Sequence, residues 1–270
     1  LFTDVGIQKN QKRFVDLILE VIDENDLNFE DMTYALTQIF SDSVPQTYKA
    51  SFLEAERLKE ESKIENSASL EFCYKKAIHN KLNCPLLIDI ANPYDGFNRF
   101  HNVSILLAPF LAALGFPTLL HGCEEVAPKR GINPYKLLLS SQKNPLKSVD
   151  EVKSCLENTK ISWGYLDQSL FFPELRNLSN LRSALVKRPV LTTIEKFLLP
   201  FYADQTYLVT GYTHPPYRQK SIDLINQLEN VSGYILFRGV EGSAQIPMDR
   251  RCPAIIGKNQ QHKENFVRPL

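Results

Sequence analysis

The stretch from residue 86 to residue 131 limits the possible folds of this 270-residue chain more than any other. It opens with a continuous apolar run, residues 86–90, of the kind found in strands buried on both faces. A turn-rich segment, residues 91–98, is followed by an apolar helix over about 105–114. Residues 116–120 then predict a second short strand. A strand, a turn, a helix and a parallel strand together form one βαβ unit.

The turn between the first strand and the helix is a natural site for a phosphate group. Free backbone N–H groups and the positive end of the helix dipole both point toward such a turn. Asn102 and Ser104 lie at the start of the helix, and the second strand ends in His121 and Gly122. The residues around these turns therefore decide what the unit can bind.

The order of these segments resembles that of the anthranilate phosphoribosyltransferases. That family has a Gly-Thr-Gly-Gly-Asp-Gly loop, then Asn-Ile-Ser, an apolar helix, Lys-His-Gly-Asn-Arg and Ser-Ser-Lys. The similar segments in this chain are residues 91–96, 102–104, 120–124 and 127–129, with further likeness at 172–176 and 239–243. The resemblance implies an α/β fold with an N-terminal helical subdomain and a mostly parallel sheet covered by helices on both faces.

Several groups on which the family's reaction depends are replaced here. The family's glycine loop lets backbone amides approach a pyrophosphate, but Pro93 has no N–H and Tyr94 adds bulk. Leu120 occupies the position of a lysine that serves the family as a phosphate-binding cation. Glu124 or Glu125 corresponds to the family's next arginine, so a positive charge has become a negative one.

The acidic pair that would hold magnesium in the family resembles Ala244-Gln245, which supplies no carboxylate. Transfer from an activated diphosphate depends on metal and cation stabilisation of the leaving group, and one preorganised donor alone contributes about 3–4 kcal/mol. We therefore expect activity to fall by several powers of ten. No catalytic residue, metal ligand or cofactor is assigned, and magnesium is expected only if the chain is an active transferase.

The family residues that remain form our candidate phosphate- or ligand-binding set. They are Asp95, Gly96, Asn102, Ser104, His121, Gly122, Lys129 and Arg182. A purely structural interpretation is equally open, with Ser104 as a helix N-cap, Gly96 at a positive-φ position and His121 as a hydrogen-bonded strand end. Arg182 resembles the arginine that faces the anthranilate carboxylate, and a guanidinium suits a carboxylate or a phosphate equally well.

A nucleic-acid-binding, catalytically degenerate branch of the family is the most similar to this sequence. The shared features are a Pro-Tyr-Asp-Gly loop, a Leu-His-Gly strand end, an Arg-Gly-Val-Glu-Gly turn and Glu195-Lys196. The resemblance implies non-catalytic binding of nucleic acid. A basic cluster of Arg176, Arg182, Lys187, Arg188 and Lys196 could line one rim of a cleft. Residues 214–217 and Arg238-Gly239, at predicted strand ends, are our second choice of site.

Composition limits the function further. The 31 basic and 31 acidic residues cancel, so nucleic acid must be attracted by a local patch if at all. Five cysteines without C-x-x-C spacing argue against structural zinc and indicate an intracellular reducing compartment, either cytoplasm or an organelle stroma. Cys123, near His121, is better explained as a buried thiol than as a nucleophile. No apolar run approaches 18 residues, so we expect no membrane span.

Helical spacing dominates residues 1 to about 80, so we expect a helical subdomain there and an α/β domain over 81–270. Part of 167–200 is expected to pack with the helical subdomain. Asn28 predicts a helix cap, a helix is expected over residues 67–79, and residues 248–270 predict a final hairpin or an ordered arm. The chain begins Leu1-Phe2, which indicates either a removed leader or a missing true start. Its ending is shorter than the family's, which indicates either an incomplete sequence or a sheet that lacks an edge.

Three functions remain open. The first, which we favour, is a non-enzymatic binding protein for single-stranded nucleic acid or a phosphate-bearing, phosphoribosyl-type ligand. The second is an active phosphoribosyltransferase with altered metal use, anchored by Asp95, Asn102, Ser104 and Lys129. The third is a structural subunit of a larger assembly. In the resembled family the helical subdomain mediates homodimerisation, so the resemblance implies a homodimer as well.

Overall fold

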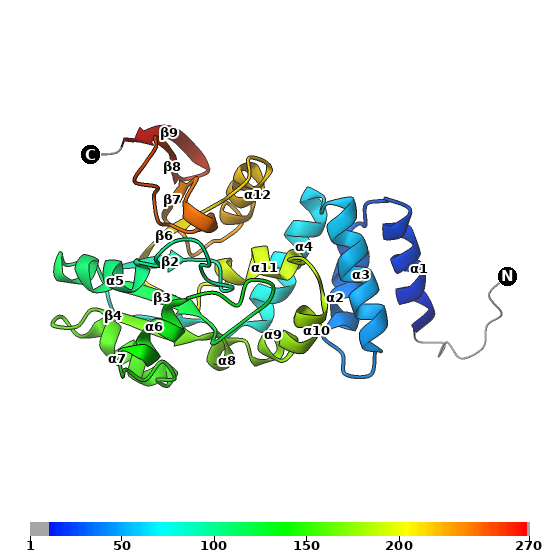
Figure 1. The fold of residues 1–270 in the computed structure, drawn as a ribbon, viewed down its shortest axis with the longest axis horizontal. Coiled ribbons are helices and arrows are strands. Elements are labelled where there is room, and N and C mark those ends of the chain that lie inside the picture. The colour runs from blue at the N-terminus through cyan, green and yellow to red at the C-terminus, as the bar shows by residue number, and fades with distance from the viewer. Residues whose placement is uncertain (1–10, 269–270) are drawn as a thin grey trace.

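The computed structural model describes residues 11–268, and its N-terminal part is a group of four helices (Figure 1). These helices are α1 Lys12–Ile22, α2 Phe29–Ile39, α3 Gln46–Lys59 and α4 Lys63–Lys76. The helical spacing of apolar residues is the reason they form, since Phe14, Leu17, Ile18 and Val21 put one face of α1 into the core. Asn28 caps α2 as predicted, because its side chain accepts a hydrogen bond from the Asp31 N–H.

Helix α4 begins earlier than the apolar spacing predicts. Its expected start near Ser67 is wrong, because a capping box fixes the start at Lys63. The Ser62 side chain accepts from the Glu65 N–H at 3.3 Å, and the Glu65 carboxylate accepts from the Ser62 N–H at 2.7 Å. Two free N–H groups at the helix end are thereby satisfied.

A seven-stranded sheet forms the other part of the molecule, in the order β4-β3-β2-β6-β7-β8-β9. The first five strands in this order pair in parallel, and β8 and β9 form an antiparallel hairpin at one edge. The predicted mostly parallel sheet is confirmed, and the tail forms the hairpin. The strands are β2 Leu86–Ala91, β3 Thr118–Gly122, β4 Trp163–Asp167, β6 Gln205–Gly211, β7 Gly233–Phe237, β8 Cys252–Lys258 and β9 Gln261–Val267.

Helices cover both faces of this sheet, as predicted. Leu119 and Leu120 are neighbours in β3 and point into two different apolar clusters, since side chains alternate along a strand. Helices α5 Ser104–Ala113 and α6 Pro134–Ser140 pack on the Leu120 side. Helices α7 Val149–Glu157 and α12 Pro216–Ile225 contribute to the other cluster.

Residues 168–197 connect the sheet back to the N-terminal helices. They form α8 Gln168–Phe171, α9 Pro173–Asn177, α10 Ser179–Ala184, α11 Val190–Ile194 and the 3-10 helix η2 Glu195–Phe197. Helices α10 and α11 contact α3, and α11 also contacts α4 (Figure 1). A short parallel pair, β1 Asn80–Lys81 and β5 Phe201–Tyr202, joins the two parts. The division near residue 80 stays a prediction, and residues 1–10 lie outside the described chain.

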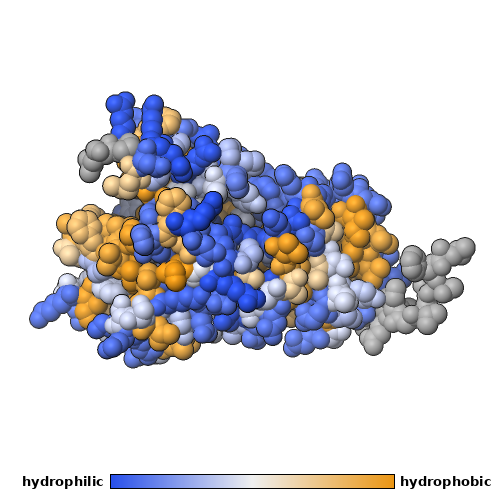
Figure 2. Space-filling view, viewed as in Figure 1, coloured by the Kyte–Doolittle hydropathy of each residue, from blue (hydrophilic) through white to orange (hydrophobic). Residues whose placement is uncertain are grey.

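Apolar side chains are exposed on α5, where Figure 2 shows them gathered at one end of the molecule. Leu106, Phe110 and Leu114 are 67%, 60% and 58% exposed and repeat at four-residue spacing, so they share one helix face. Within residues 11–268, none of the helices has the length and apolarity to cross a membrane.

Candidate functional site

The loops that follow β2, β3, β6 and β7 meet at the carboxyl edge of the sheet, where open α/β folds bind ligands. Asp95, in the loop after β2, is buried. Its Oδ2 accepts hydrogen bonds from Nε and Nη2 of Arg188 at 2.8 and 2.6 Å. Its Oδ1 is also buried and has no partner among the described residues. Asp95 therefore holds the 185–190 segment against the sheet edge.

Gly96 is required by a close approach between two loops. It has φ +74°, and a Cβ here would lie 2.7 Å from the Gly131 backbone. The Gly131 N–H donates to the Asp95 carbonyl at 2.8 Å on the same crossing. Gly122 lies at the end of β3, and a Cβ there would approach the Tyr165 hydroxyl at 3.4 Å. Gly96 is therefore required by backbone packing within the protein, whereas a Cβ at Gly122 would make an ordinary contact with the Tyr165 side chain.

Asn102 and Ser104 bond to each other at the start of α5. The N-cap residue is Val103, so the alternative that Ser104 caps the helix is wrong. The Asn102 Oδ1 accepts from the Ser104 N–H at 3.1 Å and from its hydroxyl at 2.5 Å. The Asn102 amide also donates to the Ile132 carbonyl at 3.2 Å. Both side chains are buried, and these bonds lock the helix start to the loop after β3.

His121 is held in a buried polar chain. Its Nε2 lies 2.9 Å from Asp89 Oδ1, and its Nδ1 is hydrogen-bonded to the Tyr94 hydroxyl. All three side chains are buried, and burial raises the pKa of Tyr94 well above 10.0, so that hydroxyl stays protonated. Next to this chain, burial likewise raises the pKa of the Cys123 thiol, which makes it a poor nucleophile.

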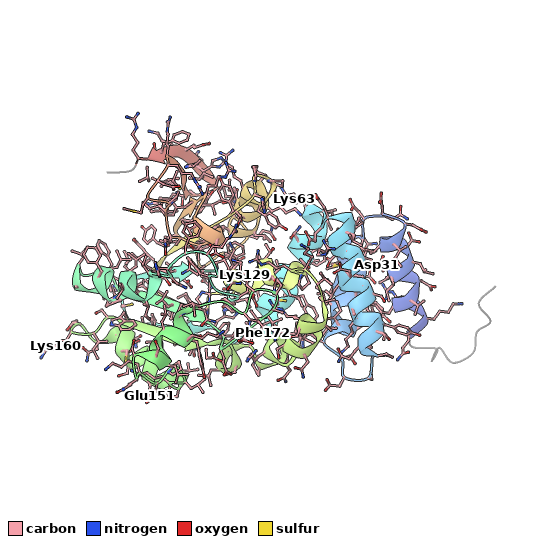
Figure 3. All side chains as sticks on the ribbon, in the orientation of Figure 1. Asp31, Lys63, Lys129, Glu151, Lys160 and Phe172 are labelled. Carbon is pink, nitrogen blue, oxygen red and sulfur yellow. The ribbon has the colours of Figure 1, made fainter. Side chains whose placement is uncertain are left out.

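Lys129, in the loop after β3, and Glu241, in the loop after β7, form an ion pair. Figure 3 labels Lys129 in the middle of the molecule. The Lys129 Nζ donates to Glu241 Oε2 at 2.7 Å. Glu241 Oε1 also accepts from the backbone N–H groups of Asn98, Arg99 and Phe100 at 3.0, 2.8 and 3.3 Å. Successive N–H groups that converge in this way form an anion site. Here the protein's own carboxylate occupies it.

The pKa of Glu241 agrees with its binding in this anion site as a charged carboxylate. Burial alone would raise its pKa, but the hydrogen bonds from Lys129 and the backbone outweigh burial and hold the pKa below 4.5. Glu241 belongs to the 3-10 helix η3 Val240–Gly242 and has φ +53°. Sequence reasoning missed it as a site residue, because the loop it binds lies more than 140 positions earlier in the chain.

The residues at the expected magnesium position do not form a metal site. The Ala244 N–H donates to the Asn92 side chain at 3.0 Å. The Gln245 Oε1 accepts from the Val103 N–H at 3.1 Å, so this amide bonds to the first residue before α5. Between residues 11 and 268 there is also no group of three or more His, Cys, Asp or Glu side chains placed to hold a metal. These side chains do not suit magnesium, a cation that prefers carboxylate and phosphate oxygens.

Arg182 is taken up by an internal ion pair. Its Nη1 and Nη2 donate to the Glu195 carboxylate at 2.6 and 2.9 Å, and Nη2 also donates to Thr192 at 3.0 Å. Arg182 and Glu195 are both fully buried. Phe172, the first residue of the 172–176 segment, stacks on Phe40 with ring centroids 5.6 Å apart. Arg182 and Phe172 are therefore both used for contacts inside the protein, one in an ion pair and the other in an aromatic stack.

Two adjoining clefts lie over this edge of the sheet. The inner cleft, about 590 Å³, runs between the loop from α3 to α4, the 187–196 segment and the ends of β2 and β6. Its basic lining residues are Arg57, Lys129, Lys187, Arg188, Lys196 and Lys220. Lys129 is the one member of the predicted set on this lining within the described chain, while Lys187, Arg188 and Lys196 come from the predicted basic cluster.

The outer cleft, about 680 Å³, lies beside β7 and the β8–β9 hairpin. Four arginines line it: Arg99, Arg238, Arg250 and Arg251. All four are exposed, and among the described residues none of them makes an ion pair. The one carboxylate on the lining belongs to Glu241, which is turned inward. Of our second-choice site, His214, Arg238 and Gly239 line this cleft, whereas Pro216 and Tyr217 line the inner cleft.

Aromatic rings accompany these arginines. Phe100 and Phe266 line the outer cleft and are 54% and 45% exposed. The Arg251 guanidinium lies 3.7 Å from the centroid of the Phe266 ring. Thr213, His214 and Glu241 line both clefts, so the inner and outer clefts adjoin each other. The arrangement is a basic groove with flat apolar surfaces beside the charges.

Similar proteins were found by sequence. No family model matches the chain. An uncharacterized protein of Aquifex aeolicus is 26% identical over 245 residues, which cover 89% of this chain and 71% of that protein. The anthranilate phosphoribosyltransferase of Francisella philomiragia is 25% identical over 186 residues, covering 68% of this chain and 54% of that enzyme. The chain thus spans about half the length of this curated enzyme.

Solved structures share the fold. The anthranilate phosphoribosyltransferase of Thermus thermophilus has a TM-score of 0.75 at 19% identity, covering 94% of this chain and 73% of that one. The yeast enzyme in complex with PRPP and Mg has a TM-score of 0.72 at 16% identity, with the same coverage. In sequence and in fold, this chain is therefore similar to the anthranilate phosphoribosyltransferases.

Proposed function

We propose that this chain has lost transferase activity and binds single-stranded nucleic acid along the outer cleft. The observation that carries the proposal is the set of four arginines without ion pairs among the described residues that line this cleft together with Phe100 and Phe266. Sequence-independent binding of single strands combines a cationic groove that follows the phosphates with aromatic rings on which bases stack. Because the net charge is zero, attraction of nucleic acid must come from such a local concentration of charge.

Two features of the site support the loss of activity. The anion site formed by the N–H groups of residues 98–100 already holds Glu241, so a diphosphate would have to displace a carboxylate that Lys129 also binds. The amide of Gln245 and the methyl group of Ala244 replace the carboxylates that would bind magnesium. Stabilisation of a leaving pyrophosphate therefore lacks both its metal and part of its backbone cradle.

The test is anisotropy with a fluorescently labelled single strand of about 20 nucleotides, measured across a range of salt concentrations. Replacing Arg250 and Arg251 by alanine is expected to weaken binding at least tenfold. Each lost phosphate contact should also reduce the slope of log affinity against log salt by about 0.7 for a single strand. The matched control replaces Lys143 and Lys160, which are exposed and line neither cleft. Figure 3 labels Lys160 at an outer edge of the molecule.

The control variant should bind as the wild type does, because it removes two positive charges without touching the groove. Equal affinities of the R250A/R251A variant and the wild type would contradict the proposal, as would the absence of any binding by the wild type at 50 mM salt. Circular dichroism on each variant separates lost binding from lost folding.

The relatives' names favour a second candidate function, a working phosphoribosyltransferase with altered metal use. Incubation with anthranilate, phosphoribosyl diphosphate and magnesium distinguishes the two. Formation of the phosphoribosylated product above the rate of a heat-denatured sample would support the transferase, and its absence alongside oligonucleotide binding would support the binding protein.

We also propose a homodimer that forms through the helical subdomain and an intracellular reducing compartment. Exposed Leu19 and Ile22 on α1 and Ile64 on α4 support the dimer surface. The five cysteines are all free thiols, which fits a reducing environment. Sedimentation of the full chain tests the dimer.

A further inference from the structure

The inner cleft contains a buried ammonium group for which the protein supplies no counter-charge. Lys196 is 7% exposed and lies on the lining of the cleft. Its Nζ donates to the Gly211 carbonyl at 2.7 Å, and no carboxylate among the described residues lies within 4.0 Å of it. An ammonium group has three donors, so further donors remain for a ligand.

Most of the other cations on the lining of the inner cleft have a carboxylate partner, so the missing counter-charge is confined to part of the cleft. Four of the six pair with carboxylates: Lys129 with Glu241, Arg188 with Asp95, Lys220 with Glu61 and Arg57 with Glu54. Lys187 and Lys196 remain unmatched among the described residues. Glu60, also on the lining, is exposed at the rim. With Lys196 protonated, the cleft has two unmatched cations against one exposed carboxylate, so it carries a net positive charge that an anion from solution can neutralise.

We propose that this end of the groove is a receptor for a terminal phosphomonoester, with Lys196 and Lys187 as its binding residues. This inference rests on the proposed function, since the phosphate would belong to the end of a strand that lies in the outer cleft. The two clefts share Thr213 and His214 on their linings, so they adjoin each other. A strand that ends at this junction can place its last phosphate beside Lys196.

The charge of the ligand follows from the count of unmatched cations. A phosphomonoester carries about −1.5 to −2 at pH 7, whereas a phosphodiester within a strand carries −1. A monoester therefore matches two ammonium groups and an internal phosphate matches one. The cleft volume, about 590 Å³, is within the range of small-molecule sites.

The protonation of Lys196 gives this site a second, independent readout. Burial, with a further contribution from the nearby Arg188 charge, lowers the pKa of Lys196 to about 7. At pH 8 most of this side chain is therefore neutral in the free protein. A dianion beside it favours the charged form, so binding should take up a proton from the buffer.

The experiment compares strands of one sequence that end in a 5′-phosphate, a 3′-phosphate or hydroxyl groups only. Calorimetry at pH 8 in two buffers with different heats of ionisation measures affinity and proton uptake together. With the wild type, one phosphorylated end should bind about tenfold more tightly than the hydroxyl ends, with proton uptake. Tenfold is the effect of about one charge-assisted hydrogen bond.

Two variants test whether Lys196 binds the terminal phosphate. In Lys196→Met, a change that keeps much of the side-chain volume, the ratio between phosphorylated and hydroxyl ends should fall to about one and proton uptake should disappear. In the R250A/R251A variant the affinity for all strands should fall while the ratio persists. Equal binding of all three ends by the wild type, or an unchanged ratio in Lys196→Met, would overturn the inference.

Failure of the proposed function gives a different pattern. If no strand binds to the wild type, inorganic phosphate and ribose 5-phosphate test the receptor alone. Saturable binding with proton uptake that is lost in Lys196→Met would assign the site to a free phosphate compound, while no heat with either probe would overturn the inference as well.

Discussion

Removal of the Glu241 carboxylate tests whether it fills the anion site as described. The side chain of Glu241 is 1% exposed and that of its partner Lys129 is 18% exposed. Hydrogen bonds to charged groups contribute about 1.5–3 kcal/mol each when their partners stay buried. Asn98, Arg99 and Phe100 are exposed, so water replaces part of what is lost. We therefore expect Glu241→Ala to lower the free energy of unfolding by about 2–4 kcal/mol.

Glu241→Gln keeps the shape and one accepting oxygen, so we expect a smaller loss of about 1–2 kcal/mol. Urea denaturation, followed by far-UV circular dichroism and by the fluorescence of the single tryptophan, Trp163, measures both variants. The control is Glu264→Ala on β9, where the ion pair with Arg218 has both side chains 38% exposed. An exposed pair contributes at most about 1 kcal/mol. If Glu241→Ala cost no more than Glu264→Ala, the account of Glu241 would be refuted.

The same pair of proteins has a defined pH dependence. The pKa of Glu241 is lowered in the folded chain, so its contribution is fully present above about 4.5 and is lost as the pH falls through the folded-state value. The stability difference between wild type and Glu241→Gln should therefore shrink as the pH falls below about 4.5. A difference that stayed constant from pH 7 to pH 3 would contradict the assignment.

Three further changes are predicted from buried groups. Glu195→Ala should cost about 3–5 kcal/mol because it leaves the Arg182 charge buried, and replacing both residues by leucine should recover most of that loss in urea denaturation. Phe172→Ala should cost about 3–5 kcal/mol through the cavity it leaves beside Phe40, again by urea denaturation. Burial lowers the pKa of Lys196 from 10.5 to about 7, so the folded chain binds fewer protons than the unfolded chain between these values. Wild-type stability relative to Lys196→Met should therefore rise between pH 7 and 10 in urea midpoints, and a flat difference would contradict this.

The architecture was predictable from local pattern. The apolar run that became β2 and the apolar helix α5 were both placed within two residues of their observed bounds. The parallel sheet followed from the alternation of strands and helices. The early start of α4 was also readable, because Ser62 and Glu65 have the spacing of a capping box, and helical periodicity alone placed the start too late.

The partners of the charged residues were not predictable. Arg182 and Glu195 lie on different short helices, and nothing in their spacing shows that they pair. Glu241 and the N–H groups of residues 98–100 are more than 140 positions apart in the chain, and the tertiary fold brings them together. Sequence resemblance assigns a residue type to a position, whereas the availability of that residue for a ligand depends on which neighbour reaches it first in the folded chain. Lys129, half of such a pair, still lines the inner cleft.

Calorimetry with phosphoribosyl diphosphate, with and without magnesium, tests the central claim most directly. We propose that the transferase architecture remains in this chain while Glu241, Ala244 and Gln245 occupy the positions of its diphosphate and metal sites. We predict no saturable, magnesium-dependent heat from a sample that binds a single-stranded oligonucleotide. Tight, magnesium-dependent binding of phosphoribosyl diphosphate to that sample would contradict the account.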